Sequence, residues 1–555
     1  MAMASRLPRL SLLILLVFTA LPPAEIQAQA GTWALTNARI ETVTRGVIER
    51  GTVLVRDGLI VAVGSEVSIP PSAVVLDLEG KTVSPGLIDL TSTLGIPSRP
   101  APQSGQGGGQ GASDGAMQAA RVFADELEAG GETLRRSRAA GVTAVLVASD
   151  RGLFRGQSAL VAMRDTLDAR AIIKSPVGEH VGYQSGGFGS YPGSLLGVIT
   201  FQRQAFYDAT RYGLAMDRWR ANPSGMARPE YDPQLEALVP FARAEMPTFV
   251  AATKENEIRR AVRLGKEHNL RLTLLGAEEA WRAIDVLPGN GVVVAVDFPR
   301  PNQVTGWGFG GSIPSLPVDS TGREEAARKM IERNPAALHD AGISFALASG
   351  GTRAADFVTN LKKAIAAGLP REVALAGATI RAAELAGVNA AMGSVETGKI
   401  ANLIVSSAPF LADSATISDV FVDGVRYALP PPPPRRATTN GGAARGRGPG
   451  AAPTIAQFGG TWTLVTNSPQ GDSEATLTVT QEGGTFTGSM VSQLGSAAIE
   501  SGQIEGAKAS WTITLDFGGQ SFSLAYAGDV DGTRISGTVT AGEFGSFTFT
   551  GEKRP

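Results

Sequence analysis

The sequence predicts an α/β chain built around a closed (β/α)8 barrel, with β segments on both flanks and a separate all-β domain at the C-terminus. From about residue 84 to 390, short apolar strands alternate with amphipathic helices, which is typical of a parallel sheet with helical crossovers. Segments 33–83 and 393–428 have the alternating pattern of antiparallel strands. Residues 455–555 contain further short strands separated by turns, which indicates a small antiparallel barrel or sandwich.

The first 30 residues have the organisation of a secretory signal peptide. Arg6 and Arg9 precede an apolar run at residues 10–21, and Ala28-Gln29-Ala30 is a small-x-small cleavage pattern. The alternatives are an uncleaved anchor or a buried helix, but the run is short for a membrane span. No later stretch is long and apolar enough to cross a bilayer. We therefore expect a secreted protein, periplasmic or extracellular, with no transmembrane span in the mature chain.

Composition limits the chemistry. The chain has no cysteine, three histidines and a formal net charge of -2. The missing cysteines exclude disulfides, thiolate metal sites and a cysteine nucleophile, and also a lipoprotein anchor. A net charge near zero argues against nucleic acid and anionic membranes as partners. With so few histidines, a multi-histidine metal centre is nearly excluded.

Two low-complexity segments divide the chain. Residues 102–115 lack apolar periodicity and are expected to form a mobile loop. Residues 430–454 begin with a proline run and continue with Gly, Ala and Arg, which is typical of a linker that is first stiff and then flexible. The arginines there are also compatible with RNA binding, but a solvated linker is the preferred interpretation. Within the N-terminal flank, Asp57-Gly58 predicts a hairpin turn.

One motif indicates a family. Residues 84–95, SPGLIDLTSTLG, resemble the first barrel strand of the amidohydrolase superfamily, which reads PGLID followed by His-x-His. The upstream strands VLVRDGLIVAVG and the downstream segments ATIRAAELAGV and GSVETGKIANLIV are also similar to the family, so the resemblance covers about residues 33–428. It implies a TIM-like barrel carrying a small composite β-sandwich. It also implies one or two divalent metals at the carboxyl ends of the strands, activating water.

The composition, the strand patterns and the resemblance together predict the domain organisation. The expected parts are a signal peptide (1–30), the N-terminal part of the sandwich (31–83), the barrel (84–392), the returning part of the sandwich (393–429), the linker (430–454) and the C-terminal β domain (455–555).

The residues that would bind metal are missing. The positions that the family's ligands would occupy hold Thr91, Thr93, Ala162, Ala251, Gly276 and Gly350. None of these side chains can hold a divalent ion in this arrangement, and no histidine lies near these strands. The insertion at residues 190–212 resembles an imidazolonepropionase-like branch of secreted bacterial proteins, which also lacks the strand-one histidines. The resemblance therefore implies the family's architecture without its usual metal site.

Polar residues at or just past the expected strand ends are the candidate site residues, because these positions carry function in barrel enzymes. They are Thr91, Ser92, Thr93, Lys254, Glu255, Glu278, Ser349 and Arg353. A Lys/Glu pair could perform acid–base chemistry. The preferred interpretation is a set of hydrogen-bonded residues that cap the barrel. A GxSxG nucleophile motif is absent.

The three histidines have different expected roles. His268 and His339 end amphipathic helices, where a structural role is ordinary. His180 leads into a Gly-rich loop and could reach the mouth of the barrel. A lone histidine is nevertheless more often a surface or hydrogen-bonded residue than a functional one.

In the C-terminal domain, Gly460-Thr461-Trp462 resembles the opening of lipocalin-like barrels. We expect this Trp to plug one end of a small barrel. The many Thr, Ser and Gly residues favour an interior filled with side chains, or a surface-binding module, over a ligand cavity.

Two functional hypotheses follow. The first is a metal-free pseudoenzyme or ligand-binding scaffold, with no cofactor, a small-molecule ligand at the barrel mouth, and either a homo-oligomer or an envelope protein as partner. The alternative is a hydrolase of carbon–nitrogen bonds in amides or cyclic amides, with an atypical site. Zinc is expected only under this alternative.

Overall fold

The computed structural model describes residues 31–97, 116–128, 131–183, 191–298, 320–430, 456–468, 471–492, 495–517, 520–540 and 546–554. The chain divides into two compact units, Met1–Arg435 and Arg436–Pro555, and each is described by itself. The expected signal segment, the loop at 102–115 and residues 431–454 of the expected linker lie outside the described residues.

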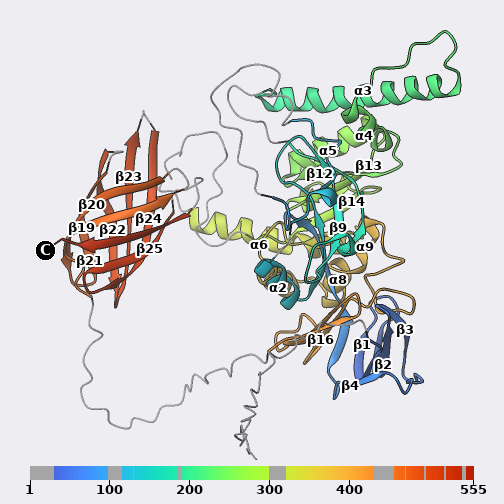
Figure 1. The fold of residues 1–555 in the computed structure, drawn as a ribbon, viewed down its shortest axis with the longest axis horizontal. Coiled ribbons are helices and arrows are strands. Elements are labelled where there is room, and N and C mark those ends of the chain that lie inside the picture. Colours follow the sequence, from blue (N-terminus) through green and yellow to red (C-terminus); the bar gives the residue numbers. More distant parts are fainter. Residues whose placement is uncertain are drawn as a thin grey trace, which may run out of the picture. The chain divides into compact units, whose positions relative to one another are not determined.

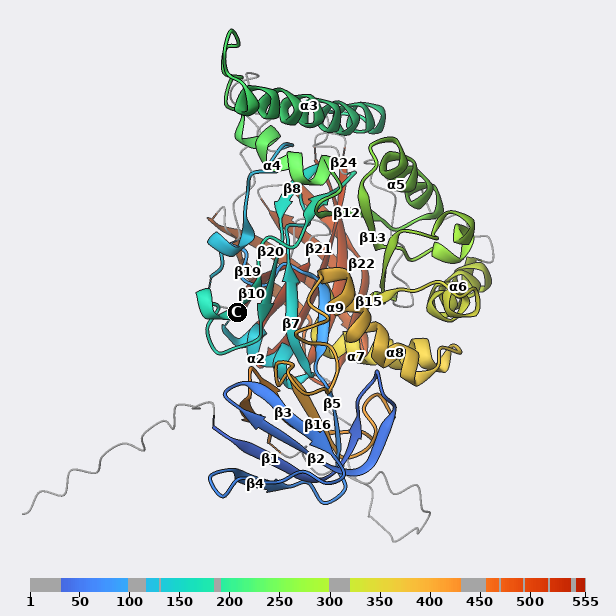
Figure 2. The same cartoon turned by 90° about the vertical axis from the view of Figure 1, so that its right-hand side faces the viewer.

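Both flanks of the first unit contribute to one eight-stranded sheet (Figure 2). Its hydrogen-bonded order is β18-β17-β16-β5-β1-β2-β3, with β4 paired to β1. Antiparallel pairing of β16 with β5 joins the two flanks. The strands are β1 (Trp33–Glu41), β2 (Val47–Arg56), β3 (Leu59–Gly64), β4 (Val74–Asp77), β5 (Thr82–Pro85), β16 (Leu403–Ser406), β17 (Ile417–Val422) and β18 (Val425–Ala428).

Two Asp-Gly turns fasten this composite sheet. Asp57 and Gly58 both have positive φ, 51° and 82°, which confirms the hairpin expected between β2 and β3. Asp423 and Gly424 repeat this conformation between β17 and β18, at 50° and 75°. The turns abut, because a Cβ on Gly424 would lie 2.7 Å from Gly58 Cα. Glycine is therefore required at Gly424 by its φ and by this close approach.

The barrel strands form two sheets, of order β10-β9-β7-β6 and β15-β14-β13-β12-β11-β8. Pairing is parallel between β6 and β7 and throughout β11 to β15. The strands are β6 (Leu87–Ser92), β7 (Val142–Val147), β8 (Phe154–Gln157), β9 (Ala159–Ala162), β10 (Ile172–Lys174), β11 (Glu179–Val181), β12 (Pro247–Ala252), β13 (Arg271–Gly276), β14 (Gly291–Ala295) and β15 (Ala346–Ala348).

One segment departs from the expected all-parallel ring. Residues 154–162 form β8 and then β9, pairing antiparallel with β11 through β8 and with β7 through β9. Only residues 148–153 connect β7 to β8, which is too short for a crossover helix. The chain therefore turns back as a hairpin, and the strand ladders form two sheets that meet at this segment.

Apolar side chains alternate between the two faces of these strands. Val250, Leu274 and Val292 belong to the cluster that packs under the surrounding helices, whereas Phe249, Leu275 and Val293 belong to a second cluster. Because successive strand residues point to opposite faces, the second cluster fills the inner side. It includes Ala382 and Ala386 of α9, so this helix also packs against the inner side.

Helices surround the barrel strands (Figure 1), and α5 and α7 bury one apolar face each, as the sequence predicts. In α5, Glu257 accepts hydrogen bonds from the Thr253 and Lys254 N–H groups and so caps the helix start. The insertion expected to contain a helix forms the long α3. The α-helices are α2 (Gly131–Ala139), α3 (Leu195–Ala221), α4 (Pro233–Ala242), α5 (Glu255–Glu267), α6 (Ser320–Asp340), α7 (Ala354–Ala366), α8 (Arg371–Gly377) and α9 (Ile380–Ala386). Single 3-10 turns are η1 (Phe123–Asp125), η2 (Ala169–Ala171), η3 (Ala280–Arg282) and η4 (Ile284–Val286).

None of the helices in the described part of the chain combines the length and apolar character needed to cross a bilayer.

The second unit is a closed antiparallel barrel in which consecutive strands pair and β26 returns to β19. Its strands are β19 (Gly460–Ser468), β20 (Gly471–Glu482), β21 (Thr485–Ser492), β22 (Gly495–Glu505), β23 (Lys508–Phe517), β24 (Gln520–Asp531), β25 (Arg534–Thr540) and β26 (Ser546–Lys553). Trp462 is fully buried, donates from Nε1 to the Phe458 carbonyl oxygen at 2.8 Å, and contacts that ring. Trp511 stacks on Tyr526 in the same core. Aromatic side chains thus fill the interior.

Candidate functional site

The mouth is defined here as the end of the first unit's barrel where the parallel strands β6, β7 and β11–β15 finish. Functional groups in barrels of this kind lie at this end. Three local groups of polar residues occur there, around Asp89, around Glu278 and around His180.

Asp89 of β6 ties this strand to the end of β15. Its Oδ1 accepts hydrogen bonds from the Ser349 N–H at 2.9 Å and from the Thr91 N–H and Oγ1–H at 3.1 and 3.0 Å. Thr91 Oγ1 also accepts from the Gly350 N–H at 2.8 Å. Ser349 Oγ donates to the Thr91 carbonyl oxygen at 3.3 Å. Two of the expected site residues, Thr91 and Ser349, are thus engaged in holding β6 and β15 together.

This network is buried. Asp89 is 7% exposed and Ser349 is 1% exposed. Burial raises the pKa of Asp89 above its ordinary 3.8, and the hydrogen bonds from Ser349 and Thr91 lower it in part. Nearby, Ser92 Oγ accepts from the Leu94 N–H at 3.1 Å, and Thr93 is exposed. The β6 end therefore has polar caps at positions where the resemblance implied metal ligands.

Two other expected ligand positions have a backbone that disfavours any side chain. Gly276 has φ of 103° and Gly350 has φ of 69°, both in the region that favours glycine. A Cβ on Gly350 would lie 2.9 Å from the Asp297 Cβ and 3.1 Å from the Ala295 Cβ. An aspartate at this position would have to displace its neighbours. At these two positions, the residue type supplies no metal ligand, and the backbone conformation also disfavours a side chain that could supply one.

Ala251 and Ala162 complete the expected ligand positions. Ala251 is half-buried near the end of β12, and its methyl group has no donor atom. Ala162 pairs with Ala144 near the start of β7 and packs with Val420 and Val422 of the composite sheet. It lies at the end of the barrel opposite the mouth, because β9 runs antiparallel. The alignment of Ala162 with a metal-bridging residue is therefore wrong.

The residues present do not fit the family's divalent metal centre. Thr, Ala and Gly occupy the ligand positions, and no group of three or more His, Cys, Asp or Glu suited to a metal occurs among the described residues.

Glu278 follows β13 and lies among other carboxylates. Burial raises the pKa of Glu278 to about 7, and the negative charges of Asp297, Glu279 and Glu257 add to this rise. The charge of Lys254 lowers it in part. A carboxyl group with a pKa near neutrality can both donate and accept a proton at physiological pH.

Two further predicted strand-end residues, Glu255 and Arg353, form ion pairs in α5 and at the start of α7. Glu255 Oε1 accepts from Arg259 Nε at 3.0 Å within α5. Arg353 precedes α7, is largely exposed and donates from Nε to Asp356 at 2.8 Å. Both ion pairs join residues within a single helix or its cap, which is a structural arrangement.

His180 lies on β11, in register with Phe249 of β12. The two rings stack with centroids 4.9 Å apart, and His180 is 3% exposed. Because Phe249 belongs to the inner cluster, His180 faces the inner side of the barrel. Burial and the charge of Arg155 lower the pKa of His180 to about 3, so its imidazole is neutral. The sequence indicates that His180 could reach the mouth of the barrel; the structure places its ring on the inner side of β11, stacked on Phe249.

The other two histidines have surroundings typical of structural residues. His268 caps α5, and its ring contacts Phe206 and Tyr207 at centroid distances of 5.3 and 4.6 Å. His339 is exposed at the end of α6.

Two mouth residues were missed from sequence. Asp297 follows β14 at the same kind of strand end as Glu278, so the same rule would have found it. Arg155 was the less obvious case: β8 reads Phe-Arg-Gly-Gln, which gives no sign that the charged side chain is buried, and only the structure shows that Arg155 is 8% exposed.

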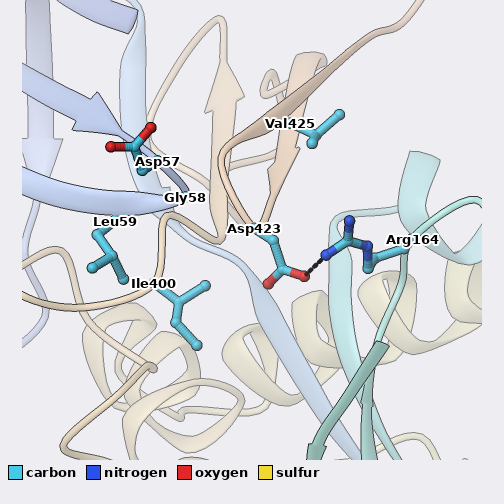
Figure 3. A pocket seen from close by; sticks show the side chains of 7 residues that line it. All are labelled: Asp57, Gly58, Leu59, Arg164, Ile400, Asp423 and Val425. Carbon is cyan, nitrogen blue, oxygen red and sulfur yellow. Dashed lines mark hydrogen bonds and ion pairs between the residues drawn. The ribbon is translucent and has the colours of Figure 1, made fainter. Parts of the chain in front are cut away.

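A separate pocket of about 340 Å³ lies at the junction of the composite sheet and the barrel strands (Figure 3). Arg164 Nη1 donates to Asp423 Oδ2 at 3.0 Å across it, and Asp57 and Leu59 line one side. The ion pair within it joins the two parts of this unit.

The first unit is a barrel of mainly parallel strands with a composite β-sheet from both flanks. Residues 242–426 match the sequence model of the amidohydrolase family. This part of the chain therefore carries the family's sequence signature on an amidohydrolase-like fold.

Similarities to individual proteins were also found. An imidazolonepropionase from Mesorhizobium japonicum (strain LMG 29417 / CECT 9101 / MAFF 303099) is 42% identical over 67 residues, a match that covers 10% of this chain and 16% of that protein. An amidohydrolase structure from Thermotoga maritima MSB8 aligns with a TM-score of 0.58 at 22% identity, covering 71% of this chain and 100% of that one. A Xaa-Pro dipeptidase structure with bound methionine aligns with a TM-score of 0.43 at 15% identity, covering 72% and 100%. The 0.58 alignment supports the fold.

Proposed function

We propose that this protein is a metal-independent, ligand-binding member of the amidohydrolase superfamily, secreted through its N-terminal segment. The observation that carries the proposal is the backbone at Gly276 and Gly350, whose positive φ is unfavourable for a ligand side chain. The network of Asp89, Thr91 and Ser349 supports it, since these groups are engaged with one another. The small-molecule ligand would enter at the mouth.

The proposal extends to the finer points of architecture and setting. In this proposal, the barrel strands form a closed TIM-like ring, and the first unit is related to the imidazolonepropionase-like branch. The C-terminal barrel is a lipocalin-like module with a filled interior. A second copy of the chain or an envelope protein would be the macromolecular partner. Light scattering on the secreted protein would test whether two copies associate. Fractionation of producing cells would test secretion.

A second candidate function is hydrolysis of a carbon–nitrogen bond by acid–base chemistry. Glu278 supports it, because a carboxyl group with a pKa of about 7 suits a general acid or base. Lys254 lies close enough to influence that group electrostatically. The substrates would be amides or cyclic amides.

One experiment separates the two candidates. The full chain, purified without chelator, is analysed for Zn, Mn, Ni and Fe and screened on amides, cyclic imides, dipeptides and lactones. The binding proposal expects neither stoichiometric metal nor turnover. Stoichiometric metal, or turnover abolished by a chelator, refutes it. Turnover that resists chelator and is lost in Glu278→Gln but kept in the matched control Glu255→Gln establishes the second candidate instead.

A further inference from the structure

Arg155 is a buried cation with little compensation. Its side chain is 8% exposed, and burial lowers the pKa of its guanidinium from its ordinary value. Within the described part of the chain, its Nε donates to the Gly152 carbonyl oxygen at 3.2 Å, and no carboxylate lies within ion-pair distance. Asp150 contributes a favourable charge from farther away. Burying a guanidinium with so few partners costs folding free energy, so its presence points to a functional role.

The position of the guanidinium is set by Gly182. A Cβ on Gly182 would lie 2.2 Å from Arg155 Nη2 and 2.6 Å from its Cζ, so the guanidinium occupies the space where a side chain would be. The Gly182 N–H donates to the Leu153 carbonyl oxygen at 2.8 Å, which continues the pairing of β11 with β8. From the other side, Gln202 Nε2 donates to the Gly182 carbonyl oxygen at 2.7 Å. The Gly182 backbone, against which the Arg155 guanidinium lies, is thus held by hydrogen bonds on both sides.

Arg155 and His180 lie on the same side of the sheet. Gly182 is two residues past His180, so the side of Gly182 that carries the guanidinium is the inner side that His180 also faces. The charge of Arg155 acts on His180, which places the two groups near each other. His180 Nε2 is buried without a hydrogen-bond partner among the described residues. Both residues therefore offer unused hydrogen-bonding capacity at the mouth.

We propose that Arg155, together with His180, binds the carboxylate of a small-molecule ligand at the mouth of the barrel. This inference rests on the proposed ligand-binding function and names its ligand class.

The charge at the site favours a carboxylate over a phosphate. Arg155 supplies one positive charge, His180 is neutral and Asp150 adds a negative charge from farther away, so the site compensates a monoanion and not a dianion. The planar fork of a guanidinium matches a carboxylate through two parallel N–H···O bonds. The unpartnered Nε2 of His180 supplies a further hydrogen-bonding group for the same ligand.

The test is an NMR titration of the full chain labelled with ¹⁵N-histidine. The chain has only three histidines, so the imidazole of His180 can be followed directly beside His268 and His339 as internal references. The probes are N-acetylglycine, N-acetylproline, N-acetylleucine and N-benzoylglycine, each paired with its neutral carboxamide, and inorganic phosphate. The expected result is that one or more carboxylates shift the His180 signals, while their carboxamides and phosphate bind at least about ten-fold more weakly.

Variants separate the site from general effects. Arg155→Gln should weaken carboxylate binding about ten- to hundred-fold, and Arg155→Lys should bind at an intermediate level because it keeps the charge and loses the fork. The matched control is Arg164→Gln, a partly buried arginine paired with Asp423 away from the mouth, which should bind as the wild type does. Should Arg155→Gln not fold, the comparison of carboxylate with carboxamide and with phosphate in the wild type decides the question.

Absence of carboxylate binding at about 10 mM, where even a millimolar Kd is detectable, would overturn the inference. So would equal binding of carboxylate and carboxamide, or tighter binding of phosphate than of carboxylate. Unchanged carboxylate binding in Arg155→Gln would overturn it as well. The proposed function fails on a different measurement, the metal content. Stoichiometric metal would refute that function and leave the titration result standing, and an absent metal with no carboxylate binding would refute only this inference.

Discussion

Replacing Glu278 by Gln should make the barrel more stable at neutral and alkaline pH, and not at acidic pH. In the folded chain, burial and the charges of Asp297, Glu279 and Glu257 oppose ionisation of this carboxyl group, and its pKa rises to about 7 from 4.5. The unfolded chain removes both effects. Glutamine keeps the shape of the side chain and has no proton to lose.

The sign and size follow from linkage. Between pH 4.5 and about 7 the folded state holds a proton on Glu278 that the unfolded state has lost, so stability falls as the pH rises through this window. Below pH 4.5 both states are protonated and the penalty is absent. Above pH 7 the full penalty is present, at most about 3 kcal/mol for this change in pKa and about 2 kcal/mol once its remaining solvent contact is allowed for. The difference in free energy of unfolding between Glu278→Gln and the wild type should therefore increase by about 2 kcal/mol, in favour of the variant, from pH 4 to pH 8.

Hydrogen exchange measured by mass spectrometry on peptides from β13 and β14 reports this difference without interference from the C-terminal barrel. Wild type and variant are compared at the same pH, so that the intrinsic exchange rates cancel. Glu255→Gln is the matched control, since it removes a carboxylate of the same neighbourhood that is paired with Arg259. A difference between Glu278→Gln and wild type that does not change with pH, or a variant that is less stable at pH 8, would refute the reasoning.

Three further predictions concern packing. Thr91→Val should cost about 1–3 kcal/mol in urea denaturation, because the buried Asp89 carboxyl group loses the hydrogen bond from the Thr91 hydroxyl; an unchanged midpoint would contradict the role of the network. Gly424→Ala should cost at least about 1–2 kcal/mol in the same assay, because of the positive φ at Gly424 and the contact with Gly58, and a neutral effect would show that the two turns can separate. Trp462→Ala should destabilise the C-terminal barrel by about 3–5 kcal/mol, measured by near-UV circular dichroism during thermal unfolding, and should leave the transition of the first unit in place.

Local sequence patterns were sufficient for much of the architecture. Asp57-Gly58 identified its hairpin because a turn of this kind depends on the two residues themselves. The alternating strands after residue 455 identified an antiparallel β domain for a similar reason. The PGLID motif led to the amidohydrolase-like fold, which the match over residues 242–426 supports.

The candidate site was predictable only in part. Strand ends are visible in the sequence, so Thr91, Ser349 and Glu278 could be named as mouth residues. Their partners could not, because Asp89 meets Ser349 across 260 positions of sequence. The antiparallel pairing of β8 with β11 and of β9 with β7 was also not foreseen, and the placement of Ala162 failed with it.

By itself, the sequence determined the chemical inventory of this protein: zero cysteines, three histidines, and Thr, Ala or Gly where the family places metal ligands. Only the tertiary structure decided what the remaining groups do. It gave Gly276 and Gly350 their left-handed backbone, raised the pKa of Glu278 by bringing carboxylates together, and laid the Arg155 guanidinium over Gly182. The physical reason is that residue type and local conformation are properties of short segments, whereas burial, electrostatic coupling and close approach arise only when distant segments pack together.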